Sequence, residues 1–309
     1  MVPTLDGGPR WRACLAALGD QRPRPALVVV DSGSSDGTPE AAEAAGARVL
    51  RIRREDFDHG ETRNLGAREL PGCDVLVFLV QDAVPQAPDC LARLAAAALR
   101  PGVGAASARQ VPPPDAGYLT ASTVSASPFA AEVARRTGPF AREQLARLPP
   151  EEWRARLLLD DVACAVRGAL FRGGGFRRTS HAEDALLAYD LLWAGWALEH
   201  EPAAVVEHGH AYDAQSVQRR YRDDAVFFRK TFGLRVRPDL LSVLKGVNAE
   251  LRRDRQWLAR HGGAPGNGSL KAARELRWAQ VLAQREGSRG PAGRPPDPLP
   301  LPSPAELGA

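Results

Sequence analysis

The stretch Ala-Leu-Val-Val-Val-Asp-Ser-Gly-Ser-Ser-Asp-Gly-Thr at residues 26–38 joins an apolar run, a polar turn and the beginning of a helix. The apolar run predicts a buried strand. Glycines at 33 and 37 favour a tight turn, and Pro39 suits the first position of a helix that Thr38 would cap. A strand, a turn and a helix in this order predict a parallel sheet covered by helices.

The same alternation extends in both directions from this stretch. Strands are predicted at residues 26–30, 48–52, 74–80 and 103–108, with helices at 38–45, 61–70 and 88–99. Residues 1–4 are typical of the last part of a first strand. In such sheets ligands bind beyond the carboxyl ends of the strands, so the loop after Val30 is placed to receive a nucleotide.

The pattern weakens after the three prolines at 112–114. A strand at 162–166, a helix at 183–194 and two short edge strands at 196–198 and 203–206 are the clearest later elements. Residues 214–284 have the spacing of amphipathic helices. The tail from Glu286 is rich in proline and glycine, which predicts disorder.

Composition narrows the class of protein. A chain of 309 residues with 44% hydrophobic residues can build a real core. The four cysteines are far apart and form no C-x-x-C pair, so neither a disulfide framework nor a zinc module is expected. No apolar run reaches about 18 residues, and the first residues do not form an export signal. We therefore expect reduced cysteines and a cytoplasmic location.

Positive charge is concentrated in one stretch, although the net formal charge is only +4. Residues 218–260 carry most of the excess of arginine and lysine in the second half. Solvated helix faces are the plainer interpretation. The alternative is peripheral contact with the inner membrane surface or with a phosphate-bearing acceptor, and no nucleic-acid partner is expected.

Five motifs occur in one order along roughly residues 2–232. They are Pro3-Thr4-Leu5-Asp6-Gly7-Gly8 with the loop 31–38, Phe57-Asp58-His59-Gly60-Glu61-Thr62-Arg63-Asn64-Leu65-Gly66, Phe78-Leu79-Val80-Gln81-Asp82-Ala83-Val84-Pro85, Glu183-Asp184 and His208-Gly209-His210. Together they resemble family 2 glycosyltransferases, especially the bacterial rhamnosyltransferase-like branch. The resemblance implies a GT-A-type fold, an α/β nucleotide-diphospho-sugar transferase fold with a Rossmann-like, mostly parallel sheet.

The resemblance and the element pattern together divide the chain. We expect a nucleotide-sugar-binding half at 1–110, an acceptor-binding and catalytic half at 111–213, a helical C-terminal extension at 214–285 and a disordered tail at 286–309.

A divalent metal, Mg²⁺ or Mn²⁺, is the expected cofactor, because a sugar diphosphate leaves with two negative charges that a cation stabilises. Asp82 follows a strand and would supply a carboxylate ligand. Most of the family has an aspartate two residues earlier, where this chain has Val80. His208 and His210 should point to one side of an extended segment, and by the resemblance one of them completes the metal shell. The sequence leaves open which one.

The acidic pair Glu183 and Asp184 opens a predicted helix. The positive end of a helix favours ionised carboxylates, so at least one of the two should be deprotonated at neutral pH, as activation of a hydroxyl requires. We assign the base to Asp184. The alternative is a pair that only complements the helix dipole.

Asp31 could accept hydrogen bonds from a base or ribose, and by the resemblance Arg63 faces the base or phosphate of the nucleotide. The other substrate-binding candidates from the motifs are Thr4, Ser32, Asn64, Gln81 and Arg109. Trp193, Trp196 and Tyr212 could stack on sugar rings, although core packing is favoured for the two tryptophans.

The resulting expectation is an inverting glycosyltransferase of polysaccharide or glycan biosynthesis. Its donor would be a nucleoside-diphosphate sugar such as dTDP-rhamnose or a UDP-hexose, and its acceptor a glycan or lipid-linked hydroxyl. Two other classes stay open. A sugar-nucleotide nucleotidyltransferase should have a basic, glycine-rich phosphate loop where this chain has residues 4–8. A non-catalytic nucleotide- or glycan-binding relative would fit Val80 and the short first strand.

Overall fold

The computed structural model describes residues 1–172, 174–210, 213–261 and 270–309. Three parallel strands, β1 (Val2–Thr4), β2 (Val28–Asp31) and β3 (Arg48–Arg51), pair in the order β1-β2-β3. Every residue of β2 is buried, as expected for a strand with both faces covered. The helices α1 (Gly8–Gly19), α2 (Thr38–Ala44) and α3 (His59–Arg68) follow these strands along the chain.

A second set of strands has the order β4-β8-β6-β9-β5, with β7 also paired to β9. Their bounds are β4 (Val75–Leu79), β5 (Val84–Pro85), β6 (Val103–Val111), β7 (Arg135–Thr137), β8 (Ala163–Arg167) and β9 (Ala197–Glu207). Because β8 is antiparallel to both β4 and β6, those two strands run in the same direction, and β9 is parallel to β6.

Two hydrogen bonds connect the two sets of strands. The Met1 ammonium donates to the Val77 carbonyl at 2.8 Å, and the Leu79 amide donates to the Met1 carbonyl at 3.2 Å, which is the pattern of a parallel pair. The carboxyl ends of β1, β2, β4, β6 and β9 therefore lie at one end of a continuous sheet. We call this end, marked by Thr4, Asp31, Asp82 and His208, the carboxyl edge.

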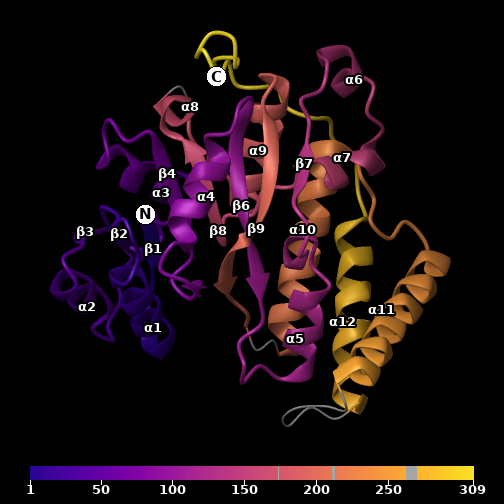
Figure 1. The fold of residues 1–309 in the computed structure, drawn as a ribbon. Helices are drawn as coiled ribbons and strands as arrows, with labels where there is room; N and C mark the ends of the chain where they lie inside the picture. The colour runs from indigo at the N-terminus through magenta and orange to yellow at the C-terminus, as the bar shows by residue number, and fades with distance from the viewer. Residues whose placement is uncertain (173, 211–212, 262–269) are drawn as a thin grey trace.

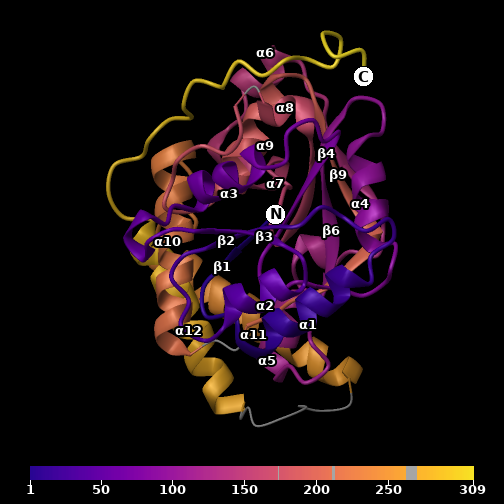
Figure 2. The ribbon, with the colours of Figure 1, turned by 90° about the vertical axis from the view of Figure 1, so that its left-hand side faces the viewer.

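Helices cover both faces of the sheet (Figure 2). The remaining helices of the α/β part are η1 (Arg54–Asp56), α4 (Cys90–Ala98), α5 (Tyr118–Ser125), η2 (Pro128–Ala130), α6 (Arg142–Ala146), α7 (Pro150–Arg156), α8 (Gly168–Arg172) and α9 (Glu183–Trp193). One core cluster contains Phe78, Trp196 and side chains of α9, and the other contains Trp11 and side chains of α4. The expected GT-A-type arrangement of sheet and helices is confirmed.

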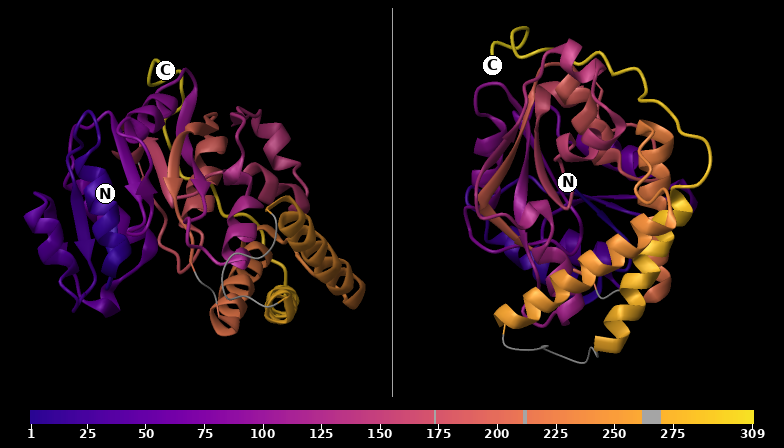
Figure 3. Two further views of the ribbon diagram at one scale, coloured as in Figure 1. Left: turned by 60° about the horizontal axis from the view of Figure 1, so that its bottom comes forward. Right: turned by 90° about the vertical axis from the view of Figure 1, so that its right-hand side faces the viewer.

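A helical extension follows, as the sequence predicted. It consists of α10 (Ala214–Phe232), α11 (Leu240–His261) and α12 (Leu270–Gly287), with α12 packed against both of the others (Figures 1 and 3). None of the helices in the described ranges has an apolar stretch long enough to cross a bilayer. The four cysteines have free thiols.

The strand β9 differs from the two short edge strands that were predicted. It is one strand in the interior of the sheet, paired with β6 on one side and with β5 and β7 on the other. Its pairing with β6 jumps from Glu201 to Val205, so the chain bulges around Pro202. Proline lacks the amide that a ladder needs, and the bulge absorbs it without ending the strand.

The tail also differs from its prediction, because parts of it pack on the protein. The Tyr189 hydroxyl donates to the Pro296 carbonyl at 2.8 Å, and the Trp196 indole donates to the Pro302 carbonyl at 2.7 Å. Leu301 is only 8% exposed and belongs to the core around α9. The average composition of the tail did not indicate that Leu301 would be buried. Prolines around it favour an extended backbone, in which Leu301 contacts the core.

Candidate active site

The loop after β2 is organised by Asp31, which is 2% exposed. Its Oδ1 accepts from the amides of Gly33 and Ser34, at 3.0 and 2.9 Å. Its Oδ2 accepts from the hydroxyls of Thr4 and Ser34, at 2.9 and 2.5 Å. A carboxylate has about four acceptor sites, so this one has none left for the ribose or base that the sequence suggested. Asp31 shapes the loop in this arrangement.

Other predicted binding residues join the strand ends in the same way. The Ser32 hydroxyl donates to the Thr4 carbonyl at 2.9 Å. The Gln81 amide pairs with both backbone groups of Leu5, at 2.8 and 3.0 Å. Thr4, Ser32 and Gln81 therefore hold β1 beside β2 and β4. The outward surface of this loop is formed by exposed residues, including Gly33 and Ser35.

Arg63 and Asn64, on α3, point toward the second half of the chain. Asn64 pairs with the backbone amide and carbonyl of Phe176, at 2.9 and 2.8 Å. Arg63 is 2% exposed, and its guanidinium lies 2.8 Å from Glu183 and 2.7 Å from Asp161. Both side chains are thus occupied by protein groups, and Arg63 faces carboxylates where the resemblance implied a nucleotide.

A cluster of carboxylates lies where β8 begins and α9 begins. Oxygens of Asp160, Asp161 and Asp184 are all within 4.8 Å of one another. Gln110, near the end of β6, donates to Asp160 at 2.9 Å. Asp160 and Asp161 were missed from the sequence. The available signal was an acidic pair directly before an apolar run, at a strand end that lies on the carboxyl edge.

Burial and mutual repulsion change the titration of this carboxylate cluster. Burial raises the pKa of Asp184 well above its usual range, and the charges of Asp161, Glu183 and Asp160 raise it further. Burial, followed by the charge of Asp161, raises the pKa of Glu183 to about 8, although Arg63 opposes the shift. Both shifts oppose the expectation that at least one of the two carboxyls is ionised at neutral pH by the helix end. The dipole effect, about 0.3–1 kcal/mol, is weaker than desolvation beside like charges.

Asp82, His208 and His210 form a second group, as predicted. Nδ1 of His210 and Nε2 of His208 lie 3.2 and 3.8 Å from Oδ2 of Asp82, and the two Nε2 atoms are 3.2 Å apart. Burial lowers the pKa of His208 to about 4, so its imidazole is neutral at neutral pH. Neutral imidazoles and a carboxylate are ligands for divalent transition metals, so the residues fit a cation such as Mn²⁺.

The two groups share the carboxyl edge of the sheet. The Val80 amide donates to the Val162 carbonyl at 3.1 Å, which brings the chain at Asp161 alongside the chain at Asp82. Burial raises the pKa of Asp160 and lowers that of His208, and the positive charge of Arg220, on α10, acts on both groups in the downward direction. Four stretches around residues 31, 82, 184 and 208 thus reach one end of the sheet, and neither Asp82 nor Asp184 is fully buried.

The remaining candidates are less closely tied to this edge. Arg109 donates to Glu132 at 2.6 Å. Trp196 is fully buried in the core, as favoured from the sequence. The ring of Trp193 lies 6.0 Å from that of Tyr189, and Tyr212 is outside the described residues.

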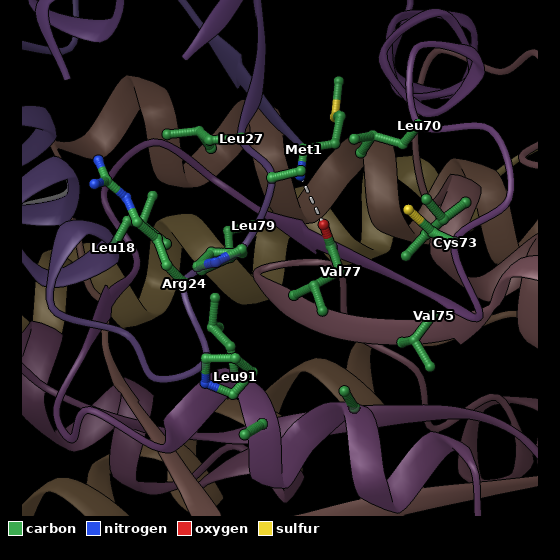
Figure 4. Close-up of a pocket in the computed structure, with 16 residues that line it drawn as sticks. Met1, Leu18, Arg24, Leu27, Leu70, Cys73, Val75, Val77, Leu79 and Leu91 are labelled. Atoms are coloured by element: carbon green, nitrogen blue, oxygen red, sulfur yellow. Dashed lines mark hydrogen bonds between the residues drawn. The ribbon is translucent and has the colours of Figure 1, made fainter. Parts of the chain in front are cut away.

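An apolar cavity lies between β1 and β4 (Figure 4). Met1, Leu27, Cys73 and Val75 are among its lining residues, and they mark the amino ends of the strands. The cavity is therefore at the opposite end of the sheet from Asp82 and His208, and it contains none of the predicted site residues.

Comparisons with known proteins show which sequences and folds the chain is similar to. A model of glycosyl transferase family 2 matches residues 1–144. An O-antigen chain rhamnosyltransferase of Salmonella typhimurium is 29% identical over 231 residues, covering 74% of this chain and 71% of its own. Another, of Salmonella anatum, is 28% identical over 234 residues, covering 74% and 70%.

One solved structure has a similar fold across most of the chain. It is a mannosyltransferase from Pyrobaculum calidifontis in complex with GDP-Man and Mn²⁺, with a TM-score of 0.55 and 19% identity. The match covers 93% of this chain and 84% of that one. At this identity the likeness establishes the fold alone.

Proposed function

Because the chain is a nucleotide-sugar glycosyltransferase of family 2, in the rhamnosyltransferase-like branch, we propose that its reaction takes place at the carboxyl edge around Asp82, Asp184 and His208. The observation that carries this proposal is the meeting of a His-Asp group and a carboxylate cluster at one end of the sheet. The reaction is the transfer of a sugar, with inversion, from a nucleoside diphosphate to an acceptor hydroxyl.

Asp82, His208 and His210 are proposed to hold Mg²⁺ or Mn²⁺. The two imidazoles favour Mn²⁺, because Mg²⁺ prefers a shell of oxygen atoms. When bound, the cation offsets the negative charge that develops on the leaving diphosphate.

Asp184 is proposed as the general base, with Glu183 as its neighbour in the acidic pair. An acceptor hydroxyl attacks the anomeric carbon, its proton passes to a carboxylate oxygen of Asp184, and the bond to the diphosphate breaks. A raised pKa makes this carboxylate a stronger base, provided that it is ionised when the acceptor arrives. Arg63 supports ionisation in the cluster because its charge faces Glu183 and Asp161.

The nucleotide is proposed to lie against the outward surface of the loop 31–38. Thr4, Asp31, Ser32 and Gln81 keep that loop in place, so their contribution to donor binding is indirect. Asn64 and Arg63 position the neighbouring segments, and Arg109 is a further donor contact.

The two rhamnosyltransferase relatives favour dTDP-rhamnose as the donor, with a UDP-hexose as the next candidate. The acceptor is proposed to be a glycan or lipid-linked hydroxyl in polysaccharide biosynthesis. The proposed division assigns donor binding to residues 1–110, acceptor binding and catalysis to 111–213, and membrane proximity to the extension 214–285. The proposed location is the cytoplasm, with peripheral contact at the inner membrane surface.

A donor screen tests the proposal. Release of nucleoside diphosphate from dTDP-rhamnose, UDP-hexoses and GDP-mannose is measured with a lipid-linked glycan acceptor, with Mn²⁺, with Mg²⁺ and with a chelator. We expect turnover with one nucleotide class, dependent on the cation. If the chelator leaves turnover unchanged, the proposed role of the metal is rejected.

A further inference from the structure

Exposed apolar side chains gather on the last two helices. Among the described residues, the exposed large hydrophobic side chains are Leu99, Val133, Leu240, Leu241, Leu244, Trp278, Leu282 and Leu307. Three of these lie at the start of α11 and two lie on α12, which packs against α11. Single exposed apolar side chains are ordinary, but a cluster on adjacent elements indicates a surface with a binding partner.

The acidic residues of α11 all point inward. Glu250 and Asp254 are its two acids, and both are buried. Asp254 pairs with Arg277 of α12 at 2.7 Å, and Glu250 pairs with Arg253 at 3.1 Å. The exposed basic residues of α11 are Lys245, Arg252, Arg253, Arg255 and Arg260. The outer surface of α11 therefore carries positive charge and no carboxylate.

On α11 the helical repeat places exposed apolar and exposed basic residues on the same face of the helix. Positions 241, 245, 248 and 252 fall on the face of α11 opposite the buried Val243, Val247 and Asp254. On α12, Arg274, Trp278, Leu282 and Glu286 recur at every fourth position and are exposed, so this row adds apolar surface with one base and one acid, and the positive charge of the face comes from α11. Figures 1 and 3 place α11 at the outer side of the molecule, with α12 beside it.

We propose that the exposed face of α11 and α12, formed by Leu241, Leu244, Lys245, Arg252, Arg255, Trp278 and Leu282, docks on an anionic lipid bilayer. Leucines that enter the interface, a tryptophan whose ring suits the headgroup region and a basic surround are the features of an interfacial helix. Each basic residue near an anionic surface strengthens partitioning by about fivefold. The inference specifies the membrane contact within the proposed function and does not depend on the transfer reaction.

A second copy of the chain fits this face less well. A two-fold interface joins the same surface on both subunits, so α11 would place its basic residues near the basic residues of the other copy. An anionic bilayer supplies the opposite charge, and it also accepts the leucines.

Vesicle sedimentation of the full chain, without donor sugar, tests the proposal. We expect binding to vesicles of phosphatidylglycerol and phosphatidylethanolamine that weakens at high salt, and little binding to phosphatidylcholine vesicles. The double variants Leu241→Glu/Leu244→Glu and Arg252→Glu/Arg255→Glu should each lose on the order of tenfold or more in partitioning. The controls are Leu99→Glu, an exposed leucine at the end of α4, and Arg12→Glu, an exposed arginine on α1. Both should bind as the parent does, and thermal unfolding verifies that every variant is folded.

Three outcomes would overturn the proposal. They are unchanged vesicle binding by both double variants, equal binding to neutral and anionic vesicles, and a dimer in light scattering that the leucine variant dissociates. The last would assign the face to a second copy. Transfer to a water-soluble acceptor is measured in parallel, so that an inactive chain that still binds vesicles would reject the proposed reaction and leave the docking surface standing.

Discussion

Two parts of the carboxyl edge, the loop after β2 and the start of α9, differ in how their carboxylates are partnered. In the loop after β2, Asp31 accepts four hydrogen bonds from its own protein, and Gln81 pairs fully with Leu5. At the start of α9, Glu183 and Asp184 share buried space with two more carboxylates and one guanidinium. The side chains of the first region are hydrogen-bonded within the protein and have a structural role. The second region contains carboxyl groups with strongly shifted pKa values, which is typical of a reacting centre.

Asp184→Asn should have the largest effect, because it removes the proposed proton acceptor while keeping its shape. We expect a fall in kcat of about 10²- to 10⁴-fold, with donor affinity retained. Kinetics of diphosphate release and calorimetric titration with the donor measure the two quantities. Turnover like that of the parent chain would reject the base assignment.

Arg63→Met would leave the buried carboxylates without their guanidinium partner. We expect a loss of about 3–5 kcal/mol in the free energy of unfolding at neutral pH, from urea titration. The loss should grow as the pH rises through about 8, because Glu183 then ionises without its guanidinium partner. Arg68→Met, an exposed position on the same helix, is the control. Equal stability of the two variants would show that Arg63 is not needed to balance the cluster.

Asp31→Asn tests the scaffold side of the comparison. The amide nitrogen cannot accept hydrogen bonds, so two donors lose their partner and the loss of stability should be about 1–3 kcal/mol. Weaker donor binding should accompany it, because the loop changes shape. Asp20→Asn, at an exposed helix end, should alter neither quantity. An Asp31→Asn chain with normal stability but no donor binding would instead favour direct contact with the nucleotide.

Asp161→Asn should shift the pH dependence of turnover. The charge of Asp161 raises the pKa of both Glu183 and Asp184, so a neutral amide lowers both. The acidic limb of the pH–rate profile should therefore move to lower pH, by about one unit. Asp115→Asn, which is exposed and distant in sequence, is the control. A shift to higher pH, or none, would disconnect Asp161 from the titrating base.

Mn²⁺ should give the smallest effect, a rise of a few degrees in Tm. Burial lowers the pKa of His208 to about 4, so this proposed ligand stays neutral in the folded chain until the pH falls through about 4. Protons compete with the cation only where they bind its ligands. The rise should therefore be lost as the pH falls toward about 4, and Asp82→Asn should reduce it at neutral pH. If the Asp82→Asn variant shows the same rise in Tm, the cation binds elsewhere, and the cluster of Asp160, Asp161 and Asp184 becomes the candidate site.

Much of the first half of the fold followed from local pattern. Apolar runs separated by turn residues located β2, β3, β4 and β6 to within a few residues. The failures came where a distant partner overrides the local signal. Two strands were predicted at 196–198 and 203–206, but β9 continues through a bulge between them. The composition of the tail predicted disorder, although Leu301 packs in the core around α9.

The site shows the same limit. Motif order pointed to Asp82 after β4, to His208 after β9 and to the acidic pair at the start of α9, and these residues lie at one edge of the sheet. It did not reveal that Asn64 is bonded to Phe176. Nor did it single out Asp160 and Asp161, since acidic residues ahead of a strand are usually turn residues. Their neighbours Gln110, Arg63 and Asp184 lie on β6, α3 and α9, which meet at the start of β8 only in the folded chain.

The packed tail makes the helix of the acidic pair depend on the last part of the chain. Asp190 of α9 is fully buried, and it is balanced by Arg177 and by the backbone amide of Leu299. Trimming the chain after α12 would remove that amide and uncover one flank of α9. Residues more than a hundred positions after Asp184 thus pack against the second half of its helix, and a deletion or a bulky fusion there would expose the buried side chains of Asp190 and Trp196.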